Sequence, residues 1–208
     1  MKIKKFLTIL IITIILLTNI STGYVKALTE NETINLVKDH TCASLLKVKG
    51  QDMMKTVVYV YYRDANGQKY PAFCVEPEKD GIGMGAGDSY DVTVNQISDN
   101  VLWRMLYKGY MGTSYWDWGL ECDDDLYYAT KTAVHCMAEN ISPKEKYEIA
   151  TRVGRYDNLS LEEVKRRSAK VLEVSQNIYD FGYSGTENYM KPVLNINKNG
   201  ELVEETIN

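Results

Sequence analysis

A hairpin signal in the first half of the chain constrains the fold most strongly. Residues 55–62 are rich in β-branched and aromatic side chains, which favour a strand. An Asn-Gly turn signal follows at residues 64–67, and residues 68–75 return as a second extended segment. The sequence therefore predicts an antiparallel hairpin that carries Cys74 near its far end. Glu76 would lie on the same strand face as Cys74, because side chains two residues apart share a face.

Helix signals dominate the second half of the chain. Cap and first-turn residues precede apolar residues at helical spacing. They predict four helices, at residues 98–108, 126–139, 142–154 and 160–179. The three acids at residues 123–125 fit a helix start better than a calcium loop, because the glycine and closing glutamate of an EF-hand are missing. The cationic run at residues 165–167 is predicted to be a solvated helix face.

These patterns together predict an α+β fold, in which a small antiparallel β-sheet packs against a helical subdomain. Shorter strands are expected at residues 45–48 and 90–94. A last hairpin signal, around Asn199-Gly200, comes after the helices and is interpreted as the start of a β-sandwich-like domain. The predicted domains are therefore residues 28–186 and an incomplete β-rich domain at residues 187–208.

The N-terminus has the pattern of a secretory signal peptide. Lysines precede an apolar run at residues 6–17, and Ala27 ends a small-residue cleavage site, so residues 1–27 are predicted to be removed. Removal takes away four lysines and no acids, which changes the formal net charge from −4 to −8. An acidic chain is a poor candidate for binding nucleic acid or an anionic membrane. We expect a secreted or cell-surface protein with no membrane insertion after signal cleavage. The richness in Lys, Ile, Asn and Tyr suggests a Gram-positive bacterium.

The chain has four cysteines and two histidines, His40 and His135. Their spacing matches no zinc pattern, and we expect neither a metal nor a cofactor. Export permits disulfides. Cys122 and Cys136 flank one predicted helix and would lie ~21 Å apart along it, so their pairing is not expected unless Cys122 folds back before the helix starts.

Cys74 has three interpretations. It can be a small buried hydrophobic side chain, which is the common state of a cysteine outside disulfides. It can be the nucleophile of a cysteine-dependent enzyme, with His135 as its base. It can also be one half of an internal covalent link. The enzyme interpretation requires a hydrogen-bond contact between Cys74 and His135, together with an orienting Asn or Asp.

Three segments follow one another in an informative order. Residues 73–77 read FCVEP, residues 98–110 combine a helix signal with Gly-Tyr, and residues 129–135 read ATKTAVH. This order resembles the thioester domains of Gram-positive surface adhesins, whose second motif is Thr-Gln-x-Ala-(Ile/Val)-Trp. The resemblance spans residues 55–196. It implies a cysteine thiolate that attacks a glutamine amide, expels ammonia and leaves a thioester that an amine of a host protein can attack.

This chain departs from that family at the acyl donor. Aligned on Thr130, the glutamine position holds Lys131. A lysine amine cannot donate an acyl group, so Cys74 cannot form the family's thioester with it. Three hypotheses follow in order of preference. The domain keeps the fold without the bond, Cys74 and Lys131 form a different link under oxidation, or a glutamine outside the motif supplies the acyl group, such as Gln68 or Gln96.

We therefore predict a binding module with no catalytic residue, in which Cys74 and Lys131 are the thioester-motif positions. Candidate supporting residues are Glu76, Thr130, Thr132 and His135, and Thr132 takes the glutamine position if the alignment slips by one residue. The resemblance implies the N-terminal host- or surface-binding module of a Gram-positive cell-surface adhesin at the cell wall. The implied partners are a host or extracellular surface protein, reached through a lysine amine where a thioester forms, and further β-rich stalk domains C-terminal to this chain.

Two other functions compete with the binding module. The first is an exported cysteine-dependent acyl-transfer enzyme, of the protease or transpeptidase kind, that uses Cys74 and His135. The second is a carbohydrate-binding module that uses Trp116 and Trp118, because aromatic rings on a loop can stack on sugars. A contact between Cys74 and His135 in an open cleft would favour the enzyme, and Cys74 directed at Lys131 would favour the adhesin.

Overall fold

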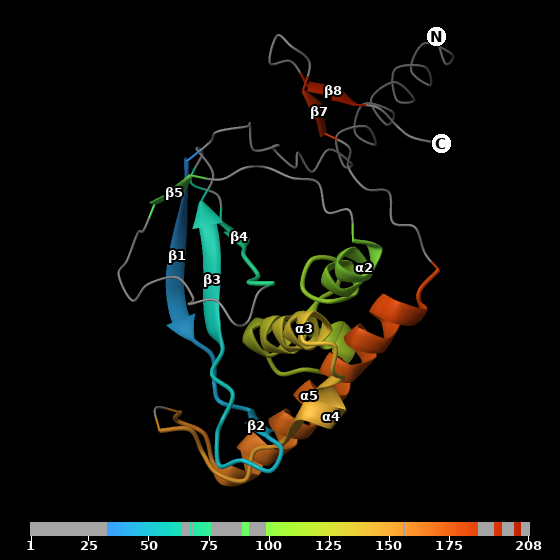
Figure 1. The fold of residues 1–208 in the computed structure, drawn as a ribbon. Coiled ribbons are helices and arrows are strands. Elements are labelled where there is room, and N and C mark those ends of the chain that lie inside the picture. Colours follow the sequence, from blue (N-terminus) through green and yellow to red (C-terminus); the bar gives the residue numbers. More distant parts are fainter. Residues whose placement is uncertain are drawn as a thin grey trace, which may run out of the picture. The chain divides into compact units, whose positions relative to one another are not determined.

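The computed structural model describes residues 33–63, 67, 69–75, 89–91, 99–155, 157–186, 194–196 and 202–204, all within one compact unit, Asn31–Asn208. The elements of its N-terminal half are β1 (Thr33–Thr41), β2 (Leu46–Val48), β3 (Val58–Arg63), β4 (Lys69–Pro71) and β5 (Ser89–Asp91). They are followed by α2 (Asn100–Lys108), η1 (Tyr115–Trp118), α3 (Asp123–Ala138), α4 (Pro143–Lys146), β6 (Tyr147–Ile149), α5 (Leu161–Ser184), β7 (Leu194–Ile196) and β8 (Leu202–Glu204), as Figure 1 shows. The predicted α+β class is confirmed.

A four-stranded antiparallel sheet has the strand order β4-β3-β1-β5. The predicted hairpin is present as β3 and β4, with Tyr61 opposite Pro71. The long strand β1 lies between β3 and β5, and a bulge between Lys38 and His40 shifts its register. The sequence did not reveal β1, because its residues mix polar and apolar side chains without a clean alternation.

Cys74 does not lie on a strand, and that part of the hairpin prediction is wrong. β4 ends at Pro71, which has no backbone N–H with which to extend the ladder. The backbone N–H of Ala72 still donates to the carbonyl of Val60 at 2.9 Å, and then the chain leaves the sheet. Cys74 therefore lies in an irregular segment, two residues after the last sheet contact.

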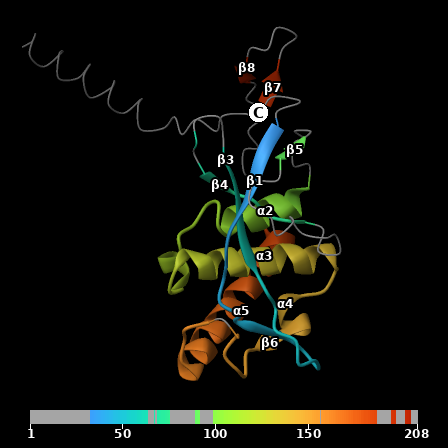
Figure 2. The ribbon, with the colours of Figure 1, turned by 90° about the vertical axis from the view of Figure 1, so that its left-hand side faces the viewer.

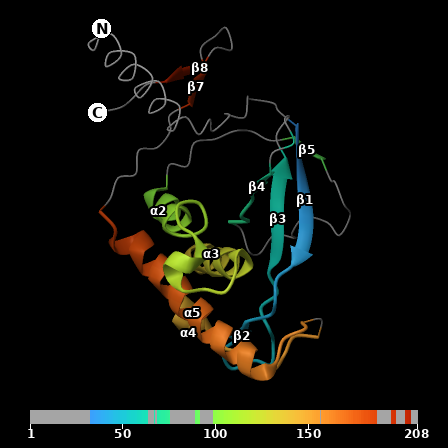
Figure 3. The ribbon, with the colours of Figure 1, turned by 180° about the vertical axis from the view of Figure 1, so that it is seen from behind.

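The helix α3 lies at the centre of the helical subdomain. It is placed between the sheet and α5, and β1 and β3 cross its sheet-facing side (Figures 1, 2 and 3). Every side chain from residue 125 to residue 130 is buried. The predicted acids occupy its first turn, where they interact favourably with the helix dipole. A helix enclosed on two sides can present side chains to the sheet on one face and to α5 on the other.

The apolar core joins the sheet side to the helices. Val57 comes from the segment before β3, Met105 from α2, Tyr127 from α3 and Ile178 from α5, and each is at most 1% exposed. Full burial of side chains of this size contributes roughly 1.5–3 kcal/mol each. α3 is therefore held in place by contacts from both sides.

Two helix boundaries differ from the sequence prediction. The N-cap of α2 is Asp99 rather than Ser98, since the Asp99 carboxylate accepts from the backbone N–H groups of Val101 at 2.7 Å and Leu102 at 3.2 Å. The last helix, α5, has the predicted N-cap, Ser160, but it ends at residue 184 rather than at residue 179.

The helix predicted over residues 142–154 is also wrong beyond its first turn. Its capping box and Pro143 are present, but α4 ends at Lys146. The next three residues form β6, which pairs antiparallel with β2 so that Leu46 lies opposite Ile149. Tyr147 is 4% exposed, and its burial against the core outweighs helix propensity at this position.

The C-terminal hairpin is present as β7 and β8, which pair antiparallel. The start of a further β-rich domain at this hairpin stays a prediction, as does the boundary near residue 186. The predicted signal peptide lies outside the described residues. None of the described helices combines the length and the apolar character that a membrane span requires.

Candidate functional site

Tyr127 of α3 fixes the chain segment that leads to Cys74. Its hydroxyl donates to the Ala72 carbonyl at 2.7 Å and accepts from the Val60 N–H at 3.3 Å. Its ring stacks on Phe73, with centroids 4.8 Å apart. The cysteine that follows is exposed and is not in a disulfide. Cys74 is therefore positioned by its neighbours' contacts with α3 and β3 rather than by strand pairing.

Aromatic rings cover the inner side of this segment. Tyr110 packs edge-on against Phe73 and Tyr127, with centroid distances of 6.2 and 5.6 Å. The hydroxyls of Tyr59 and Tyr110 are 2.9 Å apart. Burial raises the pKa of both phenols, so they stay neutral hydrogen-bonding groups at physiological pH. These rings form an apolar surface behind an exposed thiol.

The Gly-Tyr segment after α2 approaches α3 closely at Thr130. A Cβ on Gly109 would collide with the Thr130 side chain, so a glycine is needed there. The N–H of Tyr110 donates to Thr130 Oγ1 at 3.0 Å, and this hydroxyl donates to the Leu126 carbonyl at 2.8 Å. The predicted supporting residue Thr130 thus positions Tyr110 behind Cys74. Thr132 is also buried, and its hydroxyl donates to the carbonyl one turn earlier, at 2.8 Å.

Lys131 lies one helical turn after Tyr127 and faces the sheet. Its Nζ donates to the Val58 carbonyl at 3.2 Å and lies 5.7 Å from the centroid of the Tyr127 ring. Burial lowers the pKa of Lys131, and the negative charges that Cys74 and Cys42 carry when ionised oppose this shift. Among the described residues, no carboxylate forms an ion pair with the Lys131 amine.

His135 follows one further turn along the same face of α3. Its pKa is lowered to about 3, chiefly by burial and also by the charges of Lys55 and Lys131, while a hydrogen bond with the Cys74 backbone opposes the shift. Within the described part of the chain, its Nε2 atom is buried and has no hydrogen-bond partner. The ring is therefore neutral at physiological pH. A ring with so low a pKa is a weak base toward a thiol.

The structure describes the two predicted tryptophans but not the remaining candidate residues near Cys74. Glu76, Gln68 and Gln96 lie outside the described residues, so their roles stay predictions. Trp116, in η1, is 66% exposed. Trp118 is partly buried, and its ring N–H donates to Thr113 Oγ1 at 2.9 Å. The two tryptophans therefore do not form one flat exposed platform.

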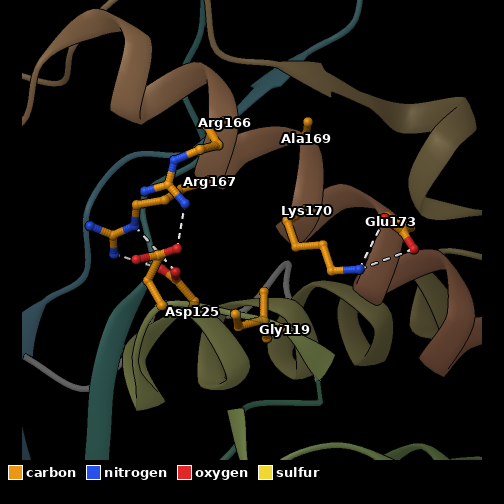
Figure 4. Close-up of a pocket in the computed structure, with 9 residues that line it drawn as sticks. Gly119, Asp125, Arg166, Arg167, Ala169, Lys170 and Glu173 are labelled. Atoms are coloured by element: carbon orange, nitrogen blue, oxygen red, sulfur yellow. Dashed lines mark hydrogen bonds and ion pairs between the residues drawn. The ribbon is translucent and has the colours of Figure 1, made fainter. Parts of the chain in front are cut away.

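A surface pocket of about 340 Å³ lies away from Cys74, between the start of α3 and α5 (Figure 4). Its cations are all paired with carboxylates: Arg166 with Glu121, Arg167 with Asp125 at 2.7 Å, and Lys170 with Glu173 at 3.2 Å. Since the charges are neutralised in place, the pocket offers no evident ligand site. The solvated-face prediction is wrong at Arg167, whose side chain is only 11% exposed, and right at Lys165 and Arg166, whose side chains are 45% and 59% exposed.

The fold that positions this site is the thioester-domain fold. A solved structure described as the Bacillus anthracis TIE protein matches 76% of this chain and 25% of its own chain, with a TM-score of 0.52 and 13% identity. The thioester domain of the Enterococcus faecium TIE86 protein matches 81% of this chain and 55% of its own, with a TM-score of 0.51 and 19% identity. This chain thus spans about a quarter and about half of the two solved chains. No protein-family model and no curated protein matches the sequence.

Proposed function

We propose that this chain is the surface-binding module of an exported adhesin from a Gram-positive bacterium, and that it binds without a thioester. The fold supports the general class. The observation that carries the proposal is the partly buried Lys131 on the sheet-facing side of α3, at the position that the motif alignment assigns to the acyl donor. A thioester needs a side-chain carbonyl carbon at that position, and a lysine has none.

The arrangement instead favours recognition through contacts. Cys74 is exposed and Val75 is 40% exposed, in front of the ring of Phe73. The exposed Val75 side chain and the Phe73 ring supply the apolar part of a small surface that a host or extracellular protein can cover, and this surface does not depend on the thiol of Cys74. The Lys131 amine donates to the Val58 carbonyl and thereby connects α3 to β3. In this proposal, the β7–β8 hairpin leads into further stalk domains that carry the module away from the cell wall.

The cysteine-dependent enzyme remains the second candidate, because the His135 ring reaches the backbone of Cys74. A base that activates a thiol must reach its proton and must have a pKa near the working pH. The pKa of His135, at about 3, is far below that range. The binding module is therefore the better supported function.

An attachment experiment tests the proposal. The exported chain is incubated with host cells or extracellular matrix, and the bound fraction is measured before and after boiling in detergent. We expect Cys74→Ala to bind as the wild type does, and detergent to release both. The matched control is Cys122→Ala, which removes a half-buried thiol at the N-cap of α3. A detergent-resistant fraction that is lost only in Cys74→Ala would overturn the non-covalent mode.

A further inference from the structure

Three metal-ligating side chains meet at the edge between the sheet and α3, away from the Cys74 motif. His40 lies on β1, Cys42 follows the end of β1, and Asp124 is in the first turn of α3. Their ligand atoms, a ring nitrogen, a thiol sulfur and a carboxylate oxygen, all lie within 4.8 Å of one another. His40 and Asp124 are 84 residues apart in sequence, so no spacing pattern could have indicated this group.

The His40 ring is oriented for ligation. Its Nδ1 is hydrogen-bonded to Asp39 Oδ2 at 2.9 Å, and its Nε2 faces Asp124 Oδ2 at 2.8 Å. The ring also stacks on Tyr59, with centroids 5.4 Å apart and planes 7° apart. A carboxylate on one ring nitrogen fixes the tautomer and raises the basicity of the other nitrogen, which is the usual support of a metal-bound histidine.

Cys42 supplies a rigid ligand on the inner side of the group. It is 2% exposed, and its backbone N–H donates to the Val57 carbonyl at 2.9 Å. The side chains of His40 and Asp124 are 42% and 35% exposed, so they can shift and leave room for a water. Donors around a tetrahedral zinc lie roughly 3.3 Å apart, given bonds of ~2.0–2.1 Å to nitrogen and oxygen. The His40–Asp124 pair, at 2.8 Å, must therefore widen slightly, and the ligand atoms that lie up to 4.8 Å apart must come closer; rotation of the two exposed side chains allows both changes.

Local charge also suits a cation. The pKa of Tyr59 is raised chiefly by burial, and the hydrogen bond with Tyr110 opposes this shift. The negative charges of Asp39, Asp123 and Asp124 raise this pKa as well, so all three carboxylates lie near the group. The opposing cations are Lys69, whose Nζ lies 3.6 Å from Asp39 Oδ1, and Lys131, whose charge acts on Cys42. Since the Lys131 amine donates to the Val58 carbonyl, it is not a ligand of the group. Three carboxylates against these two lysines leave at most one net negative charge around the group.

We propose that His40 Nε2, Cys42 Sγ and Asp124 Oδ2 bind one zinc ion, with water as the fourth ligand. Zinc is the metal that this mixture of imidazole, thiolate and carboxylate favours, since calcium and magnesium prefer oxygen alone. Binding displaces two protons: the Cys42 thiol must ionise to form the sulfur–zinc bond, and His40 Nε2 must lose the proton that it donates to Asp124 in the metal-free site. The ion links the sheet to the helix that carries Lys131, and it stabilises that contact. The site stands independently of the proposed function.

Metal content and spectroscopy test the site in the purified exported chain, in a Cys74→Ala background that removes the exposed thiol. After incubation with zinc and gel filtration, we expect one zinc per chain. Cobalt loading should give the near-ultraviolet charge-transfer band of a thiolate ligand. His40→Gln and Asp124→Asn should each weaken zinc binding, whereas Asp123→Asn, a neighbouring carboxylate outside the group, should keep it.

The second-layer variant Asp39→Asn should weaken zinc binding roughly 10- to 100-fold, as loss of a supporting carboxylate does elsewhere. Cys42→Ser can fail to fold because Cys42 is in the core, so the cobalt band of the parent reports on sulfur ligation without that variant. Cys122→Ala should keep the band. Absence of bound zinc in the parent, absence of the band, or equal zinc binding in His40→Gln and Asp123→Asn would each overturn the site.

Discussion

The buried ionisable groups at the two ends of α3 differ in their partners. At the N-terminal end, Asp125 and Arg167 are paired at 2.7 Å, with side chains 2% and 11% exposed. Towards the C-terminal end, Lys131 is held by a backbone carbonyl and a ring, and His135 by the Cys74 backbone. A paired buried charge is part of the scaffold, whereas burial without an opposite charge costs stability. Perturbed groups of this second kind cluster at functional sites, which is where the motif resemblance places Lys131 and His135.

The largest effect should come from breaking the paired end. Arg167→Ala leaves the Asp125 carboxylate buried without its partner and should lower the free energy of unfolding by about 3–5 kcal/mol. Chemical denaturation measures this change. The matched control, Arg166→Ala, removes a side chain that is 59% exposed and should cost at most ~1 kcal/mol. Equal losses in the two variants would contradict the assignment of Arg167 to the scaffold.

The buried His135 ring, towards the C-terminal end of α3, should make the stability of the protein sensitive to acid. Because burial holds the pKa of His135 at about 3, the unfolded chain binds a proton below about pH 6.5 that the folded chain does not bind until about pH 3. Stability should therefore fall as pH falls through this window, by on the order of a few kcal/mol from this ring alone. Above pH 6.5 the ring is neutral in both states and contributes no slope.

His135→Gln isolates this contribution, since acid also protonates carboxylates in every variant. Urea unfolding at several pH values between 6.5 and 3 should show a smaller loss of stability in His135→Gln than in the wild type. Identical pH dependence in the two proteins would mean that the ring is accessible to protons in the folded state.

Removing the Lys131 amine, which pairs with no carboxylate among the described residues, should stabilise the fold. Burial lowers the pKa of Lys131, so its charge is disfavoured in the folded state. Lys131→Met keeps the length of the side chain without the charge and should raise the free energy of unfolding by roughly 1–2 kcal/mol at neutral pH. Lys131→Arg keeps the positive charge, because arginine loses its proton even less readily than lysine, and should lower the free energy of unfolding. A loss of stability in Lys131→Met, measured by thermal unfolding, would mean that the amine contributes more than it costs.

A smaller difference should separate two similar threonines. Thr130 and Thr132 are both buried, and each donates to a carbonyl one turn earlier at 2.8 Å. Only Thr130 also accepts from the Tyr110 N–H. Thr130→Val should therefore cost ~1 kcal/mol more than Thr132→Val in denaturant unfolding. Equal costs would show that the Tyr110 contact adds no stability.

Local signals accounted for much of the scaffold. The pairing of β3 with β4 and the capping residue of the last helix were predicted from short-range chemistry, and both are present. The failures were caused by tertiary contacts. Tyr147 enters a strand because β2 offers a partner, and β1 forms from an unpatterned segment because it has a neighbour on each side. Arg167 is buried because Asp125 lies within reach on another helix.

The candidate site could be predicted only in outline. Motif order drew attention to Cys74 and Lys131, and their role as a motif pair stays a prediction. The contact of His135 with the Cys74 backbone links two segments that no local pattern connects. The group of His40, Cys42 and Asp124 was missed for the same reason, since a helix start meets a strand end only in three dimensions.

Intact mass before and after methylamine treatment tests the central claim, that Lys131 separates this fold from thioester chemistry. The wild-type exported chain should have the mass of its sequence, should be unchanged by methylamine, and should be alkylated at Cys74. Lys131→Gln, which restores the acyl donor, should be lighter by one ammonia and should then gain one methylamine. A wild-type chain that is itself lighter by one ammonia and gains methylamine would contradict the account. A Lys131→Gln chain of full mass would contradict the assignment of residue 131 to the acyl-donor position.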